Sequence, residues 1–225
     1  MSENFTIKTF VRRNAKTSAR QKQIYTALKP IYCIKATDHI LNLHEVFGND
    51  HPIIIEIGFG SGDATYKIAL DNPEKNYLCI EVFQSGVAKL LTKIQDHCIK
   101  NIRIIEHDAM EVLKSMIADN SIEAFHIFFP DPWPKKRHHK RRLMQSDKIR
   151  LFTEKLTAGG YIYFVTDWQE YAEKALAACT DVSSLCNRYE NFAEKQSWRP
   201  QTHFEEKALI AGRNIYELLF EKRRN

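Results

Sequence analysis

The 225-residue sequence has no CxxC pair, no HExxH motif and no long apolar run. Its five cysteines are odd in number, which argues against a disulfide framework and, without a CxxC pair, against a structural zinc site. The adjacent His138 and His139 lie in a cationic run that would repel a metal ion, so we expect no metal centre. No apolar segment approaches the ~18 residues that span a membrane, and the N-terminus lacks a signal-peptide core. These absences favour a reduced, cytoplasmic protein.

Internal repeats and low-complexity tracts are also missing from the chain. Hydrophobic residues make up 44% and charged residues 27% of it, as in ordinary soluble globular proteins. A chain of this length can bury a sizeable core, and the simplest arrangement is one α/β domain. The sequence does not distinguish a monomer from a homodimer that uses a free sheet edge.

Positive charge is concentrated in two segments. Residues 135–142 read KKRHHKRR and contain six Lys or Arg; without these six, the net charge of +5 would be −1. Residues 1–37 carry eight Lys or Arg against one acid, Glu3. We interpret residues 1–37 as a basic N-terminal arm, partly disordered without its partner, and residues 38–225 as the single domain. Two basic segments on a near-neutral body favour a nucleic-acid partner, with an anionic membrane surface as the competing interpretation.

Strand-like and helix-like segments alternate from residue 52 onward. Short apolar or β-branched runs predict strands at residues 52–57, 77–82, 102–105, 125–129, 161–165 and 215–220. Segments with helical spacing of apolar residues separate most of these runs. Repeated βα units predict a doubly wound, mostly parallel sheet, in which ligands bind at the carboxyl ends of the strands.

A glycine-rich turn follows the first of these strands, where Gly58, Gly60 and Gly62 form a G-x-G-x-G pattern. Asp63 stands where the dinucleotide fingerprint has its third glycine. The pattern instead resembles the nucleoside-binding loop of S-adenosylmethionine-dependent methyltransferases. A flavin or NAD enzyme is the alternative within this fold, but it leaves the basic segments without a role.

Acidic residues lie at the ends of the first three predicted strands. Glu81 closes the second strand, where a carboxylate can accept hydrogen bonds from both ribose hydroxyls. Asp108 follows the third strand, where a carboxylate can meet an adenine amino group. Glu56 precedes the glycines and can orient their loop or face the ammonium group of the cofactor. A solvated strand-end position is the alternative for each acid alone, whereas the three acids in this order favour the cofactor site.

The fourth predicted strand ends in residues 128–134, which read FFPDPWP, directly before the basic run. Because proline fixes its own φ and restricts the residue before it, Asp131 sits in a stiff loop. A stiff carboxylate beside dense positive charge favours a site that performs chemistry on a polyanion. The alternative is a solvated, charged surface loop without such a role. The segment is similar to the Asp/Asn-Pro-Pro-aromatic motif of adenine-N6 methyltransferases, but it lacks the second consecutive proline. The methyl acceptor therefore need not be an exocyclic amine.

Six segments occur in the order that is typical of one family: EIGFGSG at 56–62, IEV at 80–82, HDA at 107–109, residues 129–142, TDW at 166–168 and RPQTHFE at 199–205. Over residues 50–221 the chain thus resembles the bacterial tRNA (guanine-N7-)-methyltransferases, most specifically through PDPWPKKRHHKRR. Many members have Lys at the position of His203 and often Gly at that of Ala208. The resemblance implies the Rossmann-like, mostly parallel seven-stranded sheet of class I methyltransferases.

The resemblance also implies a function. This function is methyl transfer from S-adenosyl-L-methionine to N7 of guanine at position 46 in the tRNA variable loop, which forms 7-methylguanosine. Asp131 would be the catalytic residue and would also contact the cofactor. The cofactor-binding residues would be Glu56, Gly58, Gly60, Gly62, Glu81, Asp108, Ala109 and Asp131. The substrate-binding residues would be Lys135, Asp167, Thr202, His203, Phe204 and Glu205.

The chemistry of guanine N7 is consistent with these residues. N7 already carries an in-plane lone pair, so catalysis rests mainly on orientation and electrostatics, and fixed carboxylates stabilise the positive charge that develops on the ring. Asp131, Asp167 and Glu205 can accept hydrogen bonds from guanine N1–H and from the N2 amine. The residues expected to hold tRNA phosphates are Arg137, Lys140, Arg141 and Arg142.

Alternatives stay open for three residues and for the protein as a whole. Trp133 and Trp168 can stack on a base or pack within their loops, and Arg199 can contact a phosphate or be a plain surface charge. The whole chain can also be a small-molecule methyltransferase with basic surface segments, or a non-catalytic RNA-binding protein on the same fold. Acids at every cofactor position argue against the RNA-binding protein.

Overall fold

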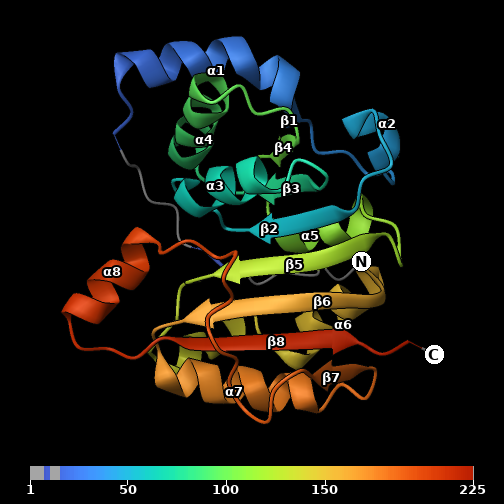
Figure 1. Ribbon diagram of the computed structural model, residues 1–225, viewed down its shortest axis with the longest axis vertical. Coiled ribbons are helices and arrows are strands. Elements are labelled where there is room, and N and C mark those ends of the chain that lie inside the picture. The colour runs from blue at the N-terminus through green and yellow to red at the C-terminus, as the bar shows by residue number, and fades with distance from the viewer. Residues whose placement is uncertain (1–7, 11–15, 225) are drawn as a thin grey trace, which may run out of the picture.

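One eight-stranded sheet organises the computed structural model, which describes residues 8–10 and 16–224 (Figure 1). Its strands lie in the order β1-β4-β3-β2-β5-β6-β8-β7. They are β1 (Cys33–Ile34), β2 (Ile53–Ile57), β3 (Asn76–Ile80), β4 (Ile102–Ile105), β5 (Ile122–Phe128), β6 (Leu156–Thr166), β7 (Leu185–Asn187) and β8 (Tyr216–Lys222).

Neighbouring strands from β1 to β6 are parallel, whereas β8 runs antiparallel to β6 and β7 antiparallel to β8. This arrangement confirms the doubly wound, mostly parallel sheet that the sequence predicts. The sheet has eight strands instead of the expected seven because Cys33 and Ile34 pair with Ile104 and Ile105 at the edge of β4. A strand of two residues is too short to leave a periodic pattern in the sequence.

Helices cover both faces of the sheet (Figure 1). One apolar core joins the strands to α2, α5, α6 and α7, and a second core joins their opposite faces to α1, α3 and α4. The helices are α1 (Ala19–Tyr32), α2 (Leu43–Phe47), α3 (Asp63–Asp71), α4 (Gln84–Asp96), α5 (Ala109–Ser115), α6 (Ser146–Lys155), α7 (Gln169–Thr180) and α8 (His203–Ile210), with a short 3₁₀-helix η1 (Lys136–Arg141).

The central strands belong to both cores because their side chains alternate between the two faces of the sheet. Ile53, Ile55 and Ile57 of β2 lie in the first core, whereas Ile54 lies in the second. Every residue of β2 and of β3 is buried, as expected for parallel strands that are covered on both faces. This double burial explains the near-continuous apolar run that marks β2 in the sequence.

Helix α1 packs against α4 and contacts β4. Ile24 is its one buried residue and contributes to the second core. The Tyr25 hydroxyl and Lys29 Nζ donate hydrogen bonds of 2.6 and 2.7 Å to the carboxylate of Glu106, just after β4. With a single buried residue, α1 lacks the apolar stripe that would reveal a docked helix in the sequence.

The structure thus places a helix and a strand, residues 19–34, inside the range that the sequence assigns to a basic arm. The parts of that range at residues 1–7 and 11–15 lie outside the described residues. None of the described helices combines the length and the hydrophobicity that a membrane-spanning segment requires.

The carboxyl ends of β2, β5 and β6 point to the same side of the molecule, where α8 lies (Figure 1). The loops that follow these strands carry the glycine pattern, the FFPDPWP segment and the TDW segment. Both α8 and the short β7 come from a stretch of chain in which the sequence shows no regular pattern. This side of the sheet is therefore where the motifs of distant segments come together.

Substitution of Gly86 should disturb this region, because α4 packs closely on the glycine loop. A Cβ atom added at Gly86 would lie 2.3 Å from the backbone oxygen of Gly60. We expect Gly86→Ala to lower the free energy of unfolding by about 1–3 kcal/mol, as overpacking does, in urea titrations. Gln84→Ala, at an exposed position of the same turn, is the control. Equal stability of the Gly86 variant and the wild type would contradict this packing.

Candidate active site

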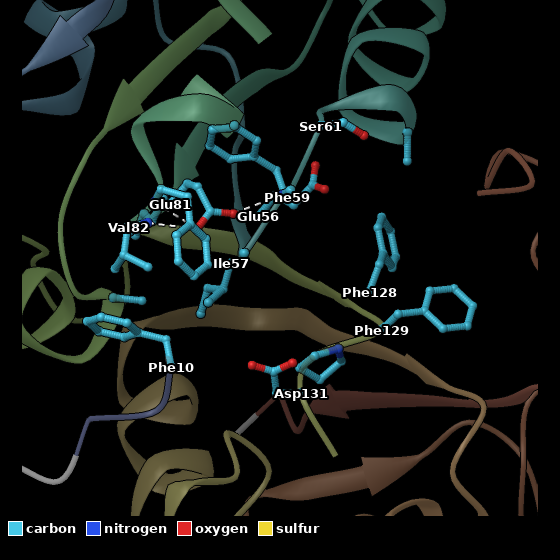
Figure 2. A pocket seen from close by; sticks show the side chains of 18 of the residues that line it. Phe10, Glu56, Ile57, Phe59, Ser61, Glu81, Val82, Phe128, Phe129 and Asp131 are labelled. Carbon is cyan, nitrogen blue, oxygen red and sulfur yellow. Dashed lines mark hydrogen bonds between the residues drawn. The ribbon is translucent and has the colours of Figure 1, made fainter. Parts of the chain in front are cut away.

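A cavity of about 320 Å³ opens at the carboxyl ends of the strands. Its walls come from the loops after β2, β3 and β5, from the start of α8, and from Thr9 and Phe10. Figure 2 shows the carboxylates of Glu81 and Asp131 on opposite sides of this cavity. The position is the one at which doubly wound sheets bind ligands. Nine residues that the sequence analysis assigns line it: Glu56, Gly58, Gly60, Glu81, Ala109, Asp131, Thr202, His203 and Phe204.

The glycine loop forms the wall between β2 and α3. Gly58, Gly60 and Gly62 have φ angles of +74°, +59° and +70°, which glycine adopts without strain. A Cβ at Gly62, the N-cap of α3, would lie 2.8 Å from Cδ1 of Leu90. At Gly58 and Gly60 an added Cβ would meet no atom within 4 Å. The loop therefore presents bare backbone to the cavity.

Glu81 holds this loop against the end of β3. One of its carboxylate oxygens accepts a hydrogen bond of 2.9 Å from the N–H of Gly60. The other accepts bonds of 2.8 and 3.2 Å from the N–H groups of Val82 and Phe83. Burial raises the pKa of Glu81, and these three backbone hydrogen bonds oppose the shift. The side chain is fixed at the wall of the cavity, where the sequence predicts a ribose-binding carboxylate.

Glu56 is an unusual buried acid. It lies in the middle of the sheet at the cavity wall with 2% of its surface exposed. Its Oε2 atom is buried and has no hydrogen-bond partner among the described residues. Burial raises the pKa of Glu56 to about 8 against the opposing effect of the nearby Thr65 hydroxyl, and the charge of Glu81 adds to the shift. A buried acceptor without a partner at a cavity wall fits a ligand that donates hydrogen bonds or carries positive charge.

Asp131 lies in a strained loop at the end of β5. Phe129 and Trp133, two positions before and after it, have φ angles of +48° and +45°, which are unfavourable for bulky side chains. The N–H of Phe129 donates a 2.8 Å hydrogen bond to the carbonyl of Val165 on β6. Such strain persists only where surrounding contacts enforce it, and it is found preferentially at functional sites.

Arg142 supplies one of these enforcing contacts. Its side chain is 2% exposed, and Nε donates a 2.7 Å hydrogen bond to the carbonyl of Pro132. Nη2 donates a 2.6 Å bond to Glu170, and the guanidinium lies 4.7 Å from the ring centroid of Tyr171. Because these contacts hold Arg142 inside the protein, its predicted role as a phosphate contact is wrong. One buried arginine among eight basic residues has no signature in the sequence.

The other phosphate-contact candidates are more accessible. Lys135, Arg137 and Lys140 are exposed, although Lys135 does not line the cavity as a substrate-binding residue would. The guanidinium of Arg141 lies 4.9 Å from the ring centroid of Trp133. These residues form a cationic surface next to the loop of Asp131, and their contact with phosphate stays a prediction.

Trp133 packs within its own loop, one of the two alternatives that the sequence leaves open. Its indole N–H donates a 3.2 Å hydrogen bond to the carbonyl of Thr9, and its ring meets His138 edge-on at 5.7 Å. Trp168 is 36% exposed at the N-cap of α7, so its alternatives stay open.

The RPQTHFE segment is divided between the cavity and the interior. Thr202, His203 and Phe204 line the cavity, whereas Glu205 is 4% exposed and does not line it. Glu205 instead binds Arg199, whose side chain is fully buried at 0% exposure. Both alternatives for Arg199, a phosphate contact and a surface charge, are therefore wrong, and the predicted direct contact of Glu205 with guanine is not supported by its position.

Two further predicted site residues, Asp167 and Asp108, do not line the cavity. Asp167 accepts a 2.9 Å hydrogen bond from Nε of Arg213. Asp108 is the N-cap of α5 and accepts a 2.8 Å bond from the N–H of Met110. Contact of Asp108 with adenine and of Asp167 with substrate stays a prediction.

Part of the cavity wall, including Phe10 and Phe83, lies outside the motifs of the sequence. Phe10 lines the cavity and meets Phe83 edge-on, with their ring centroids 6.4 Å apart. Phe83 directly follows the IEV segment, so its position next to a motif could have indicated its place at the cavity. Phe10 lies in the arm, far from every motif, and no local signal places it here. Within residues 8–10 and 16–224, no cluster of three or more His, Cys, Asp or Glu side chains could hold a metal ion.

Comparison with known proteins identifies relatives over nearly the whole chain. A family model described as a putative methyltransferase matches residues 50–218. The tRNA (guanine-N(7)-)-methyltransferase of Nitrosomonas eutropha is 41% identical over 222 residues, which cover 99% of each chain. The enzyme of the same name from Bordetella pertussis is 41% identical over 96% of this chain and 85% of its own. The chain belongs to the tRNA (guanine-N7-)-methyltransferase family.

A solved structure supports the fold of this family member. A 30S ribosomal A1408 methyltransferase from an uncultured bacterium superposes with a TM-score of 0.54, covering 80% of this chain and 92% of that one. At 17% sequence identity this likeness concerns the fold alone.

Family membership makes S-adenosylmethionine the cofactor, and the cavity fits this molecule. Its sulfonium and ammonium groups are positive, and the unpartnered oxygen of Glu56 offers an acceptor at the wall. The open space beside Gly58 and Gly60 allows close approach of a ligand to the backbone. Glu81 stands beside that loop, where it can bind hydroxyl groups.

The raised pKa of Glu56 gives a pH dependence that can be measured without any ligand. In the folded protein its pKa is about 8, above the ordinary value of 4.5, so the folded state binds this proton more tightly than the unfolded state. The contribution of Glu56 to stability is therefore fully present at low pH and is lost as pH rises toward 8, at up to about 1.4 kcal/mol per pH unit.

We expect the free energy of unfolding of Glu56→Gln to fall less between about pH 5 and pH 8 than that of the wild type. Urea titrations of the cofactor-free proteins at several pH values measure this difference. Glu74→Gln, a change at an exposed acid, is the matched control and should follow the wild type. Parallel curves for all three proteins would show that Glu56 does not titrate in this range.

Proposed function

We propose that this protein transfers the methyl group of S-adenosyl-L-methionine to N7 of guanine at position 46 in the tRNA variable loop, forming 7-methylguanosine. One observation carries the proposal: Asp131, on a strained loop, stands between a cavity that fits the cofactor and an exposed basic run. The names of the relatives from Nitrosomonas and Bordetella support the choice of base and atom. Because the proposed substrate is tRNA, we expect the protein to act in the cytoplasm.

The cofactor end of the cavity would bind and orient. S-adenosylmethionine, when bound, supplies an electrophilic methyl group on a sulfonium centre. Glu81 would accept hydrogen bonds from the ribose hydroxyls, with the glycine loop against the nucleoside. Glu56 would accept a hydrogen bond from the ammonium group through the oxygen that has no partner among the described residues. These contacts fix the direction in which the methyl group faces the acceptor, and orientation of this kind accounts for much of the rate of a two-substrate reaction.

The acceptor end of the cavity would recognise guanine and stabilise charge. Guanine N7 carries a lone pair in the plane of the ring, so no base has to remove a proton before methylation. Asp131 would accept hydrogen bonds from N1–H and the N2 amine, a donor pair that guanine presents among the common bases. The ring becomes cationic as the methyl group arrives, and a fixed carboxylate stabilises that charge.

The basic run would hold the tRNA backbone. Lys135, Arg137 and Lys140 are exposed next to the Asp131 loop, and Arg141 lies over Trp133. Contacts of these residues with phosphates would position the RNA without reading its sequence. Arg142 does not belong to this surface; its hydrogen bond to Pro132 instead keeps the Asp131 loop in place.

A direct experiment uses purified protein, methyl-labelled S-adenosylmethionine and an unmodified tRNA transcript with a guanine in its variable loop. The product is reduced with borohydride and cleaved with aniline, which cuts at 7-methylguanosine. One cut in the variable loop is the expected result. Label without a cut would refute the N7 assignment, and a protein that binds the cofactor without labelling tRNA would favour a small-molecule methyltransferase or a non-catalytic RNA-binding protein.

Asp131→Asn tests the role of the carboxylate. The change keeps the shape of the side chain and removes its charge, so we expect kcat to fall by about 10²–10³-fold. The Kd of the cofactor, measured by calorimetry, should change little. Asp147→Asn, at an exposed acid at the start of α6, is the control. Equal losses in kcat and in cofactor affinity would mean that Asp131 serves mainly to bind the cofactor.

The phosphate contacts should appear in the salt dependence of tRNA binding. Each phosphate contact contributes about 0.7–0.9 to the slope of log K against log salt concentration, so Arg137→Ala and Lys140→Ala should each lower the slope by about that amount. Filter binding between low and moderate salt measures the slope. Lys114→Ala, at an exposed lysine of α5, should leave it unchanged. Affinity that does not vary with salt in the wild type would rule out the phosphate contacts.

A further inference from the structure

A buried guanidinium joins α8 to β8. The side chain of Arg199 is 0% exposed, and those of its two carboxylate partners, Glu205 and Glu217, are each 5% exposed. One terminal nitrogen of Arg199 donates to Glu205 and to the carbonyl of Pro200, and the other donates to both Glu205 and Glu217. Lys195 adds a hydrogen bond of 2.8 Å to Glu205 from the surface. The four side chains thus form one hydrogen-bonded cluster. In this cluster Nε of Arg199 has no partner among the described residues, and burial raises the pKa of Glu217 to about 7.

This cluster is anchored in the sheet on one side. The hydroxyl of Tyr163, on β6, donates a hydrogen bond to Glu217 on β8. The same hydroxyl accepts a 3.4 Å bond from the N–H of Gln196. Tyr163 and Glu217 are both buried, and β6 and β8 are hydrogen-bonded neighbours. Arg199 is therefore fixed relative to β6 and β8.

On its other side the cluster fixes the first turn of α8. Oγ1 of Thr202 accepts a 3.1 Å hydrogen bond from the N–H of Glu205, and the Glu205 carboxylate accepts a 3.4 Å bond from the N–H of Thr202. This capping box includes His203 and Phe204, which line the cavity together with Thr202. The place of these three lining residues therefore depends on where the carboxylate of Glu205 is held.

We propose that Arg199 is a positioning residue for the methyl acceptor, and that Glu205 acts through it instead of touching guanine. Arg199 links Glu205 to Glu217 and so sets where Thr202, His203 and Phe204 stand at the cavity. This inference rests on the proposed function, since it concerns the guanine substrate of that reaction.

The geometry separates Glu205 from Asp131. Asp131 lines the cavity, whereas Glu205 is buried behind it and both of its oxygens already accept hydrogen bonds from Arg199. Burial alone would raise the pKa of Glu205, but the hydrogen bonds from Arg199 and Lys195 hold it below its ordinary value. A charged Glu205 turned toward guanine would leave Arg199 with a buried charge that is only partly compensated, which is strongly unfavourable.

Glu217→Gln is the decisive variant, because Glu217 is buried on β8 and does not line the cavity. The change weakens the link between Arg199 and the sheet while keeping the side-chain shape. We expect kcat for tRNA methylation to fall by about 10–100-fold, as for a small displacement of substrate-positioning groups, with the Kd of the cofactor unchanged. Full turnover in the folded Glu217→Gln protein would overturn the proposal.

Glu221→Gln is the matched control. It lies four residues further along the same strand, and its ion pair with Arg188 at 3.0 Å is at the surface, so its turnover should equal that of the wild type. Arg199→Lys gives a second route if Glu217→Gln does not fold, because it keeps the charge and loses the forked donor geometry. It should lower turnover as Glu217→Gln does, and a folded Arg199→Lys protein with full turnover would again contradict the inference.

A base analogue tests whether Glu205 reads guanine. Inosine lacks the 2-amino group, so a residue that accepts a hydrogen bond from this group loses its effect on an inosine substrate. We expect Glu205→Gln to slow methylation of tRNA with guanine and tRNA with inosine at the target position by the same factor, leaving their ratio as in the wild type. If the ratio of the guanine rate to the inosine rate moves toward one in Glu205→Gln and in no other variant, Glu205 contacts the 2-amino group directly.

Failure of this inference and failure of the proposed function give different results. If wild-type protein produces no aniline-sensitive site in tRNA, the proposed function is wrong. If the wild type produces the site and the folded Glu217→Gln and Arg199→Lys proteins produce it at the same rate, only the positioning role of Arg199 is wrong.

Discussion

Parallel pairing of β2 with β3 on one side and with β5 on the other determines where the chemistry of this protein is located. Ile57 pairs with Ile80, so the loop that begins at Gly58 starts beside Glu81. The N–H of Gly58 donates a 2.8 Å hydrogen bond to the carbonyl of Ile80, which joins the two strand ends. On the other side Glu56 pairs with His126, and β5 then continues to the Asp131 loop. Three motifs that are distant in sequence meet because these registers align the strand ends.

The second constraint on the site is electrostatic. A long positive run and several acids at strand ends suggest a surface that only contacts a polyanion, but Arg142 of that run and the distant Arg199 are both buried. Arg142 holds the Pro132 carbonyl, and Arg199 holds Glu205 and Glu217. A buried guanidinium can bind several acceptors in fixed directions, which makes it suited to hold irregular backbone in place. Buried cations, and not regular hydrogen-bonded ladders, thus hold the loop of Asp131 and the start of α8 in place.

Most of the fold and about half of the site follow from local sequence. Apolar runs such as residues 53–57 predict buried strands because parallel strands are covered on both faces, and motif acids such as Glu81 are placed by the strand that they end. The eighth strand could not be foreseen, since Cys33 and Ile34 are too few to show a period. The sequence does not indicate helix α1, because Ile24 is the one buried residue of that helix. In both cases tertiary contacts create an element that local pattern does not specify.

The errors at the site have one physical origin. Arg142, Arg199 and Glu205 are charged, and charged residues are rarely buried unless they are paired. Their partners lie on other elements: Glu170 is on α7 and Glu217 on β8. A sequence motif identifies such a residue as important without revealing whether it faces a ligand or a buried counter-charge. Only the three-dimensional structure shows whether such a residue contacts the substrate or holds another residue that does.

Burial of acids at the cavity also couples stability to binding. Glu56 and Glu81 both have raised pKa values because the protein removes them from water, and burial therefore disfavours the ionised form of each. A cationic ligand favours the ionised form by supplying opposite charge where Oε2 of Glu56 has no partner among the described residues. Any ligand that binds only the folded state stabilises it in proportion to its affinity. Burial of these acids is thus unfavourable by itself, and the same burial favours a positively charged ligand such as a sulfonium cofactor.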